Sequence, residues 1–152
     1  MSFNETPFLI KRTDDAKDLP LPSRATPMSA GMDLRANVQN EMVIAPGERK
    51  RVPTGIKIAL PFGYEAQIRA RSGLALKFGI GTVNSPATID ADYRGELTVL
   101  LINWGSKPFV IQRGDRIAQI VICEVVMKVF TEAENLPEST RGEGGFGHSG
   151  HR

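Results

Sequence analysis

The sequence predicts an all-β protein, and three observations support this prediction. Short apolar runs recur along the chain with the periodicity of strands, and 10 prolines and 15 glycines separate them. Only one segment carries both the start and the stop signal of a helix. The length of 152 residues suits one domain with its own hydrophobic core. These features are typical of a β-barrel or a β-sandwich.

The expected strands are short, and marked turns separate them. Residues 64–70 alternate between polar and apolar side chains, as a half-buried strand does. Residues 117–130 are rich in Val and Ile and lack Gly and Pro, which indicates a long strand buried on both faces or packed in a subunit interface. In chain order, the expected strands are 8–11, 32–36, 42–44, 51–52, 55–59, 64–70, 82–83, 96–103, 109–111 and 117–130.

One short helix is expected between two of these strands. Ser72 is a suitable N-cap, residues 74–78 can form the helix, and Gly79 is a suitable C-terminal stop. The tripeptide Arg113-Gly114-Asp115 resembles an adhesion motif, but in this context it predicts a hairpin turn.

Composition narrows the function classes. The net charge of +2 is too small to indicate binding to nucleic acid or to a membrane surface. No apolar run reaches the ~20 residues of a membrane span, and the N-terminus lacks the pattern of a signal peptide. A single cysteine, Cys123, allows no internal disulfide. We therefore expect a cytoplasmic protein with no nucleic-acid or membrane partner.

The chain divides into an expected core, residues 1–130, and an expected flexible arm, residues 131–152. Residues 141–150 contain five glycines together with Arg141 and Phe146. Ordering a backbone costs about 1–2 kcal/mol per residue, so such a segment should stay mobile alone. Because Arg binds phosphate and Phe offers a stacking face, one interpretation is a lid that orders over a ligand with phosphates and a planar ring. The alternative is a disordered tail.

Four segments of the core carry residues that suit chemistry. Arg71, Ser72 and Gly73 stand where a strand meets the helix and could bind an anion, or they could be a plain helix cap. The loop 84–95 offers an amide, carboxylates and a tyrosine, although turn chemistry alone explains such residues. Gln119 is a polar residue in an apolar strand and indicates a polar cavity. Asp33 suits a structural hydrogen bond better than direct metal ligation.

A protein-built zinc site is not expected. The only two histidines, His148 and His151, lie in the tail, and no Cys/His cluster accompanies them. The glycine-rich tail is also no phosphate-binding P-loop, because Gly-Lys-Ser/Thr is absent after it.

Taken together, five ordered segments resemble the five motifs of the trimeric dUTPases, and the resemblance spans the chain from about residue 21 to residue 150. The stretch LPSRA at 21–25 also resembles the bacterial branch of that family. The five segments are AGMDL (30–34), RSGLA (71–75), NSPATIDADYRG (84–95), GDRIAQ (114–119) and RGEGGFGHSG (141–150).

The resemblance implies a distorted jelly-roll, or β-clip-like, barrel in a homotrimer whose active sites lie at subunit interfaces. It implies that Asp90 activates the water that attacks the α-phosphorus of dUTP, giving dUMP and pyrophosphate. Mg²⁺ would be held through the substrate phosphates, with Asp33 supporting the metal site indirectly. The residues implied to bind substrate are Arg71, Ser72, Gly73 and Gln119 for the triphosphate; Asn84, Thr88, Ile89, Tyr93 and the backbone near Thr98 for the nucleoside; and Arg141 and Phe146 from the arm.

One position departs from the family pattern, and two other functions compete. The family has glycine where Ala87 stands, so a backbone that needs a positive φ there would be strained. A dCTP deaminase of the same fold is an alternative, but it uses a glutamate where this chain has Asp90 and lacks the arm with its phenylalanine. The other alternative is a non-catalytic nucleotide-binding module, which could have lost its base or its arm, whereas this chain has both.

Overall fold

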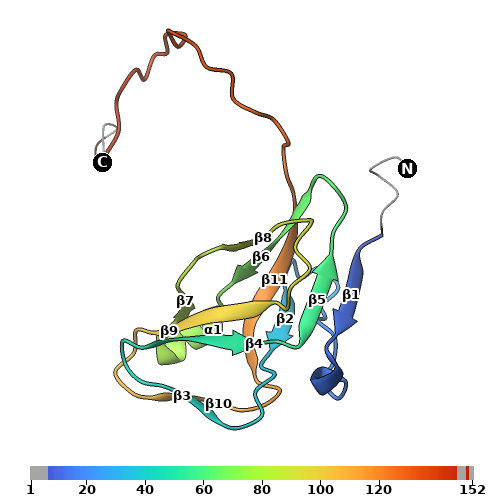
Figure 1. Ribbon diagram of the computed structural model, residues 1–152. Helices are drawn as coiled ribbons and strands as arrows, with labels where there is room; N and C mark the ends of the chain where they lie inside the picture. Colours follow the sequence, from blue (N-terminus) through green and yellow to red (C-terminus); the bar gives the residue numbers. More distant parts are fainter. Residues whose placement is uncertain (1–6, 147–149, 151–152) are drawn as a thin grey trace.

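The computed structural model describes residues 7–146 and 150, and within them the chain is built mainly of strands (Figure 1). The strands form only antiparallel pairs, which short connections allow. The elements are β1 (Leu9–Arg12), the 3₁₀ turn η2 (Asp14–Ala16), β2 (Met32–Arg35), β3 (Met42–Ile44), β4 (Arg49–Pro53), β5 (Ile56–Ala59), β6 (Tyr64–Arg69), α1 (Ser72–Phe78), β7 (Ile80–Thr82), β8 (Ala87–Ile89), β9 (Thr98–Asn103), β10 (Phe109–Ile111) and β11 (Arg116–Glu124).

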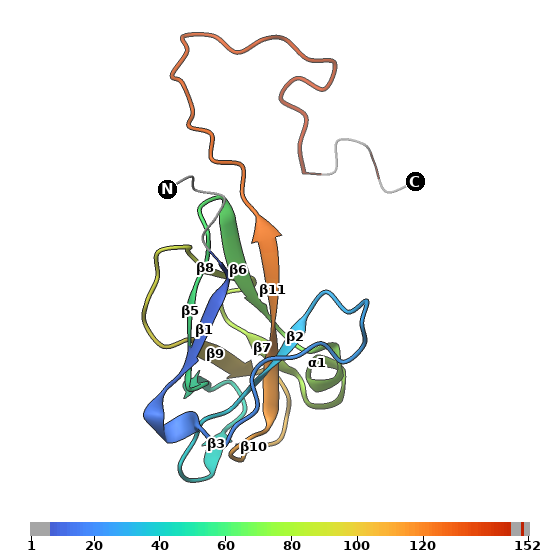
Figure 2. The same cartoon turned by 90° about the vertical axis from the view of Figure 1, so that its right-hand side faces the viewer.

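Four small sheets share these strands. The largest has the order β2-β11-β6-β8, and the others have the orders β4-β9-β7, β1-β5 and β10-β3. Figure 2 shows β11 running between β2 and β6. Non-consecutive neighbours within each sheet are typical of a jelly-roll, so the all-β, jelly-roll-like fold expected from the sequence is confirmed. None of the helices in the described ranges is long and apolar enough to cross a bilayer.

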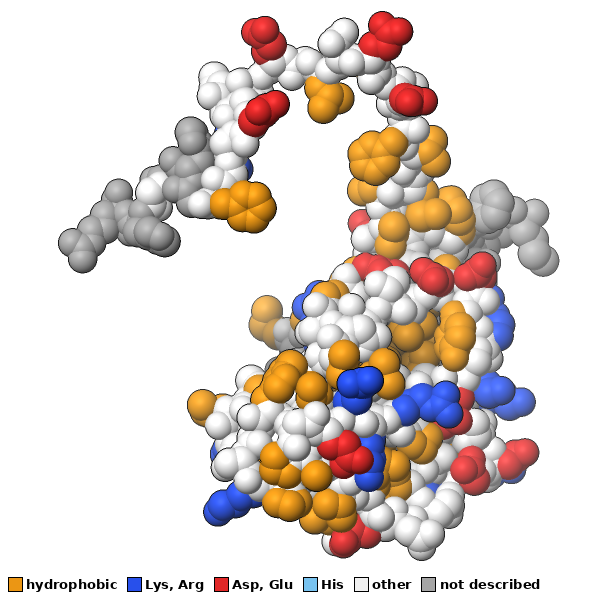
Figure 3. Space-filling view, turned by 60° about the vertical axis from the view of Figure 1, so that its left-hand side comes forward, with side chains coloured by type: hydrophobic (Ala, Val, Ile, Leu, Met, Phe, Trp, Pro, Cys, Tyr) orange, Lys and Arg blue, Asp and Glu red, His pale blue; other side chains and the backbone are white. Residues whose placement is uncertain are grey.

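The long strand expected at 117–130 is wrong at its C-terminal end. β11 ends at Glu124, and the last backbone bond to the barrel runs from Val125 N to Gly63 O at 2.8 Å. Beyond it the described residues of the chain form no ladder, because no neighbouring strand lies beside them. Figure 1 shows this segment rising from β11 and arching away from the barrel. In Figure 3 apolar side chains cover its base, where Val126, Met127, Val129 and Phe130 are exposed.

Two further details differ from the sequence prediction. The helix begins at Ser72 and its N-cap is Arg71, so the prediction of Ser72 as the cap is wrong. Gly79 ends the helix in the left-handed conformation at φ 69°, as expected. Strand β8 was not predicted, because its three residues lie within a loop rich in turn-forming residues.

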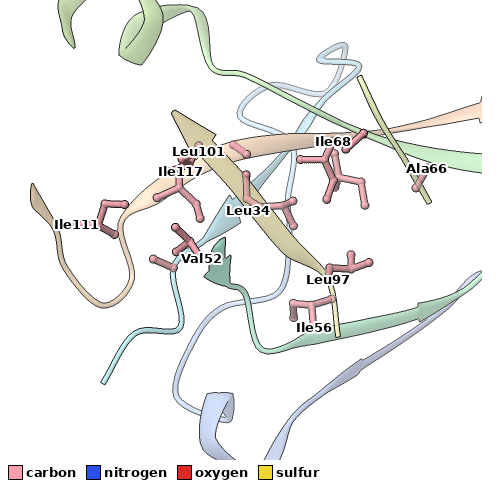
Figure 4. Packing of buried hydrophobic residues seen from close by; sticks show 14 of the residues in the cluster. Leu34, Val52, Ile56, Ala66, Ile68, Leu97, Leu101, Ile111 and Ile117 are labelled. Atoms are coloured by element: carbon pink, nitrogen blue, oxygen red, sulfur yellow. The ribbon is translucent and has the colours of Figure 1, made fainter. Parts of the chain in front are cut away.

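The core lies between the sheets and is made of aliphatic side chains. Figure 4 shows Leu34 from β2, Ile68 from β6 and Leu101 from β9 pointing toward one another. All three are essentially inaccessible to solvent. Each such side chain contributes about 1.5–3 kcal/mol to folding through burial, so the alternate positions that face this core determine the register of the strands.

A polar cluster around Arg113 fastens the β10–β11 turn to the N-terminal segment. The Arg113 guanidinium donates to Asp18 at 2.7 and 3.0 Å, to the Asn37 side-chain oxygen at 2.6 Å and to the Asp15 carbonyl at 2.6 Å. The predicted hairpin turn at 113–115 is confirmed, with Gly114 at φ 84°. Because β11 starts directly after this turn, the cluster helps to fix where β11 enters its sheet.

This cluster predicts a specific dependence of stability on pH. Hydrogen bonds from Thr13 and Asn37 lower the pKa of Asp15, and the hydrogen bond from Arg113 lowers the pKa of Asp18. A carboxylate with a lowered folded-state pKa stabilises the fold above its ordinary pKa of 3.8, and this contribution is lost as the pH falls through the folded value.

We therefore expect Asp18→Asn to lower the urea midpoint of unfolding near neutral pH, with a difference from the unmodified protein that shrinks below pH 3.8. Asp14→Asn is the matched control, since Asp14 is 96% exposed and pairs only with the exposed Lys17. Equal midpoints for Asp18→Asn and the unmodified protein at neutral pH would contradict the role of the cluster.

Candidate active site

Two arginines converge on one carboxylate at the edge of the largest sheet. Arg71 Nε lies 3.1 Å from Asp33 Oδ1, and Arg116 Nη1 lies 3.1 Å from Asp33 Oδ2. Arg71 also donates to the Arg116 carbonyl at 3.0 Å. We call these three residues the arginine cluster. With two guanidinium groups around one partly buried carboxylate, it carries a net positive charge and suits an anion such as phosphate.

Gln119 lies in the middle of the same sheet beside this cluster. On β11 it stands opposite Asp33 of β2 on one side and Arg69 of β6 on the other. Its amide nitrogen donates to the Ala70 carbonyl at 2.9 Å. A Cβ placed on Gly31 would lie 3.0 Å from Gln119 Cδ and closer still to Oε1. Gly31 therefore provides the space that the Gln119 side chain occupies.

The first turn of α1 adds hydrogen-bond donors next to Arg71. Ser72 and Gly73 are the first two helical residues and are exposed. The N–H groups of such residues have no acceptor within the helix. The sequence predicted an anion site from Arg71, Ser72, Gly73 and Gln119, and the structure brings these residues together with Asp33.

A second group of predicted residues lines a small cavity elsewhere on the barrel. The cavity has a volume of about 190 Å³. Ligand pockets usually enclose about 300–1,000 Å³, so this cavity is smaller than a usual ligand pocket. The lining residues are Thr88, Ile89, Asp90, Tyr93, Glu96, Leu97 and Thr98.

The loop from 90 to 96 folds tightly at this cavity. Tyr93 N donates to the Asp90 carbonyl at 3.1 Å, and the Tyr93 hydroxyl donates to the Glu96 carbonyl at 3.1 Å. Asp90 and Tyr93 are both exposed at the cavity. A carboxylate beside an aromatic ring in a concave site can accept a proton from a bound water while the ring contacts a ligand.

Ala87 fits the backbone without strain. It lies in β8, pairs with Ile68 of β6 and is 8% exposed. Among the described residues other than glycine, only Phe146 has a positive φ. The strain considered for an alanine at this position is therefore absent, and the methyl group packs in the core.

Asn84 does not reach the cavity formed by this chain. It is exposed in the loop between β7 and β8, and it is not among the residues that line the cavity. Its predicted contact with the nucleoside stays a prediction.

The arginine cluster and the cavity lie on opposite edges of the sheet. Asp33 belongs to β2 and Thr88 to β8, and two strands separate them in the order β2-β11-β6-β8. At about 4.8 Å per strand spacing, the two edges are roughly 14 Å apart. One chain therefore presents two separate partial sites.

The described residues of the arm make no hydrogen bond to either partial site within this chain. Arg141 Nε donates to the Gly144 carbonyl at 2.7 Å, which closes a turn inside the arm, and the Phe146 ring is fully exposed. Residues 147–149, 151 and 152, including His148 and His151, lie outside the described residues. The roles expected for Arg141 and Phe146 at the ligand stay predictions.

The side chains that could act as ligands of a divalent cation near the arginine cluster are few among the described residues. Across residues 7–146 and 150, no three side chains of the types His, Cys, Asp and Glu gather as a metal site requires. Both oxygens of Asp33 are engaged by guanidinium groups. Direct ligation of a metal by Asp33 would therefore compete with these two ion pairs.

Sequence reasoning did not single out Arg116, Glu96 or Leu97. Arg116 lies inside the segment 114–119, and its side chain pairs with Asp33 next to a register shift between Arg116 and Ala118. Glu96 and Leu97 directly follow the loop 84–95. Their closeness to Tyr93 along the chain was the one sign in the sequence that they could line the same cavity.

A jelly-roll-like chain with an arginine cluster and a separate small cavity suits a protein that binds a phosphate-bearing ligand. Comparison with known proteins shows which family the chain belongs to. A sequence model of the dUTPase family matches residues 17–150. A deoxyuridine 5'-triphosphate nucleotidohydrolase of Thermoanaerobacter sp. (strain X514) is 57% identical over 141 residues, covering 93% of this chain and 95% of the relative. The protein of the same name from Maricaulis maris (strain MCS10) is 56% identical over 146 residues, covering 95% of this chain and 96% of the relative.

A solved structure agrees with these relatives. The dUTPase of Staphylococcus bacteriophage 80alpha, solved with dUPNHPP, has a TM-score of 0.84 and 26% sequence identity, covering 95% of this chain and 98% of that chain. The protein described here belongs to the dUTPase family.

The arginine cluster predicts a measurable contribution of Asp33 to stability. We expect Asp33→Asn to lower the free energy of unfolding by about 1–2 kcal/mol, because two guanidinium groups lose the anion that they share. Urea unfolding at one fixed protein concentration and low salt measures this change. Asp92→Asn, which removes an exposed carboxylate in the 84–95 loop, should leave the free energy unchanged, and equal values for the two variants would contradict the prediction.

Proposed function

We propose that this protein hydrolyses dUTP to dUMP and pyrophosphate. The observation that carries the proposal is the cavity in which Asp90 lies beside Tyr93 and Thr98, in a chain whose dUTPase match includes all of these residues. Two relatives that are 57% and 56% identical over most of this chain bear the name deoxyuridine 5'-triphosphate nucleotidohydrolase. A cytoplasmic location, with no nucleic-acid or membrane partner, belongs to the same proposal.

In the proposed reaction Asp90 acts as the general base. Its carboxylate takes a proton from a water whose oxygen attacks the α-phosphorus in line, and the bond from that phosphorus to the bridging oxygen of pyrophosphate breaks. Thr88, Ile89 and the backbone near Thr98 hold the uracil and sugar, and Asn84 reaches the uracil in the complete site. Tyr93 packs under the deoxyribose and disfavours a 2'-hydroxyl.

The triphosphate is assigned to the other partial site. Arg71, Gln119 and the N–H groups of Ser72 and Gly73 bind its oxygens, and Arg116 adds positive charge beside Arg71. Asp33 keeps both guanidinium groups oriented through its two carboxylate oxygens. Mg²⁺, held through the phosphates with only indirect support from Asp33, would neutralise charge on the pyrophosphate leaving group.

The proposal includes a homotrimer with the sites at subunit interfaces. The two partial sites lie on opposite edges of one sheet, so a substrate that needs both must lie between two copies. The exposed apolar segment 125–130 and an apolar groove of about 460 Å³ support association. Exposed apolar surface of this kind usually marks an interface. Phe8, Leu9, Leu21, Ile56, Ile120 and Ile122 are among the residues that line the groove.

The arm, residues 131–152, is proposed to close over the bound nucleotide. Arg141 would reach the γ-phosphate and Phe146 would stack on uracil. Because these two groups match opposite ends of one ligand, closure requires both the triphosphate and the base. The exposure of the described part of the arm in Figure 1 supports a segment that is available to close.

The reaction is tested by measuring pyrophosphate release with Mg²⁺ from dUTP, dCTP and dTTP. We expect rapid release from dUTP alone. Replacing Asp90 by Asn should lower turnover by about 10²–10⁴-fold, the usual contribution of a general base, while dUTP binding is largely retained. Asp92→Asn is the matched control, since it changes an exposed carboxylate two residues along the same loop.

Three results would contradict this assignment. Release of ammonia from dCTP would indicate a deaminase, and unchanged turnover in Asp90→Asn would show that another group is the base. Binding of dUTP without turnover in the unmodified protein would indicate a non-catalytic module.

Removing the arm gives an independent prediction. A chain that ends at Asn135 should keep the mass of the trimer and its thermal midpoint, because the described residues beyond it make no contact with the barrel. Its kcat/KM for dUTP should fall by about 10²-fold or more, since the substrate is no longer enclosed and oriented. Light scattering and steady-state kinetics measure these quantities.

Point substitutions test separately the two proposed contacts of the arm, that of Arg141 with the γ-phosphate and that of Phe146 with uracil. Arg141→Ala and Phe146→Ala should each lower kcat/KM, whereas Leu136→Ala, an exposed apolar change in the same arm, should not. A truncated chain that fails to fold or to assemble would contradict the lid.

A further inference from the structure

The Tyr93 side chain folds back over Gly95. Its hydroxyl donates to the Glu96 carbonyl at 3.1 Å, three residues further along the chain. The ring therefore crosses the intervening backbone at Gly95. A Cβ placed on Gly95 would lie 2.9 Å from Tyr93 Cε2 and closer still to Cζ and to the hydroxyl oxygen. Real Cβ atoms do not approach other atoms so closely, so only glycine at this position permits the observed ring position.

The acceptor of the tyrosine hydroxyl belongs to a rigid part of the barrel. Glu96 Oε1 accepts a hydrogen bond from Gly55 N at 2.7 Å. Next to it, the Leu97 carbonyl accepts from the Thr54 hydroxyl at 2.7 Å, and Leu97 N donates to the Ile56 carbonyl at 2.8 Å. Because the 96–97 backbone is fastened to the β4–β5 turn, a collision at Gly95 is relieved by movement of the ring and not of the acceptor.

The backbone conformation alone does not require glycine here. Gly95 is not among the glycines with a positive φ, which include Gly63 and Gly79. An alanine could therefore adopt the backbone angles. The requirement for glycine comes from the contact with Tyr93.

We propose that Gly95 is a positioning residue that determines the sugar specificity of the site. By leaving room for the Tyr93 ring, Gly95 holds the ring against the cavity that Asp90 and Thr98 also line. In that position the ring occupies the space that a 2'-hydroxyl would need. A side chain at 95 moves the ring, and the site then accepts a ribonucleotide. This inference rests on the proposed hydrolysis of dUTP and deepens it.

The test compares dUTP with UTP in the full-length protein. For Gly95→Ala we expect the ratio of kcat/KM for dUTP to kcat/KM for UTP to fall by about tenfold or more, the size expected when shape complementarity to one small group is lost. The readout is this ratio, because a general loss of folded protein lowers both rates equally and leaves the ratio unchanged. Asp92→Ala, an exposed change in the same loop, should keep the ratio of the unmodified protein.

A double-mutant cycle shows whether Gly95 acts through the ring. In a Tyr93→Ala background there is no ring to displace, so adding Gly95→Ala should change the ratio by less than about twofold. If Gly95→Ala alone lowers the thermal midpoint, Tyr93→Ala must restore it in the double variant, because the colliding atoms are gone.

Three outcomes would overturn the inference. They are an unchanged ratio in Gly95→Ala, an equal fall of the ratio in the Tyr93→Ala background, and a destabilisation by Gly95→Ala that Tyr93→Ala does not relieve. Failure of the proposed function is distinguishable from all three, because the unmodified protein would then release no pyrophosphate from dUTP.

Discussion

The pairing of β11 with β2 on one side and β6 on the other is the constraint on which the site depends. In this register Gln119 stands opposite both Asp33 and Arg69, while Ile120 and Ala118 face buried surroundings. A shift by one residue would reverse which side chains point to the core, and it would bury Gln119 in place of an aliphatic side chain. The burial of aliphatic residues along β11 thus holds a polar side chain beside the arginine cluster. The register shifts between Arg116 and Ala118, and on the far side of this shift the Arg116 side chain pairs with Asp33 at 3.1 Å.

The same sheet keeps the two candidate parts of the site apart. Two strands, β11 and β6, lie between β2, which carries Asp33, and β8, whose residues line the cavity. Moving these groups together within one chain would require removing β6, which contributes Ala66 and Ile68 to the core. The packing of the barrel therefore keeps the two candidate parts of the site apart within one chain. The proposed association of identical copies would bring them together, because the edge of one sheet can face the opposite edge of another.

The parts of this structure that the sequence predicted are those governed by local patterns. Alternation at 64–70 predicted β6, and Gly79 predicted the end of α1, because side-chain burial and left-handed φ depend on nearby residues. The end of β11 was not predictable in this way. Residues 125–130 have strand-forming side chains, but a strand also needs a neighbour, and the described chain provides none there. Similarly, the sequence singled out Ser72, Gly73 and Gln119 as candidates for the site, whereas the contact of Arg116 with Asp33 lies beside a register shift that has no clear sign in the sequence.

Two glycines position the side chains of neighbouring residues by leaving space for them. Gly31 leaves the space that Gln119 occupies, and Gly95 leaves the space that the Tyr93 ring crosses. At neither position does a positive φ account for the glycine, so the cause is the close approach of another side chain. Each of those side chains is held at its far end by a hydrogen bond to a backbone carbonyl, that of Ala70 or of Glu96. A polar side chain fixed at its tip and confined along its length has few alternative rotamers. Its geometry is then set by contacts within this chain, and such preorganisation lowers the entropy cost of binding for any side chain that contacts a ligand.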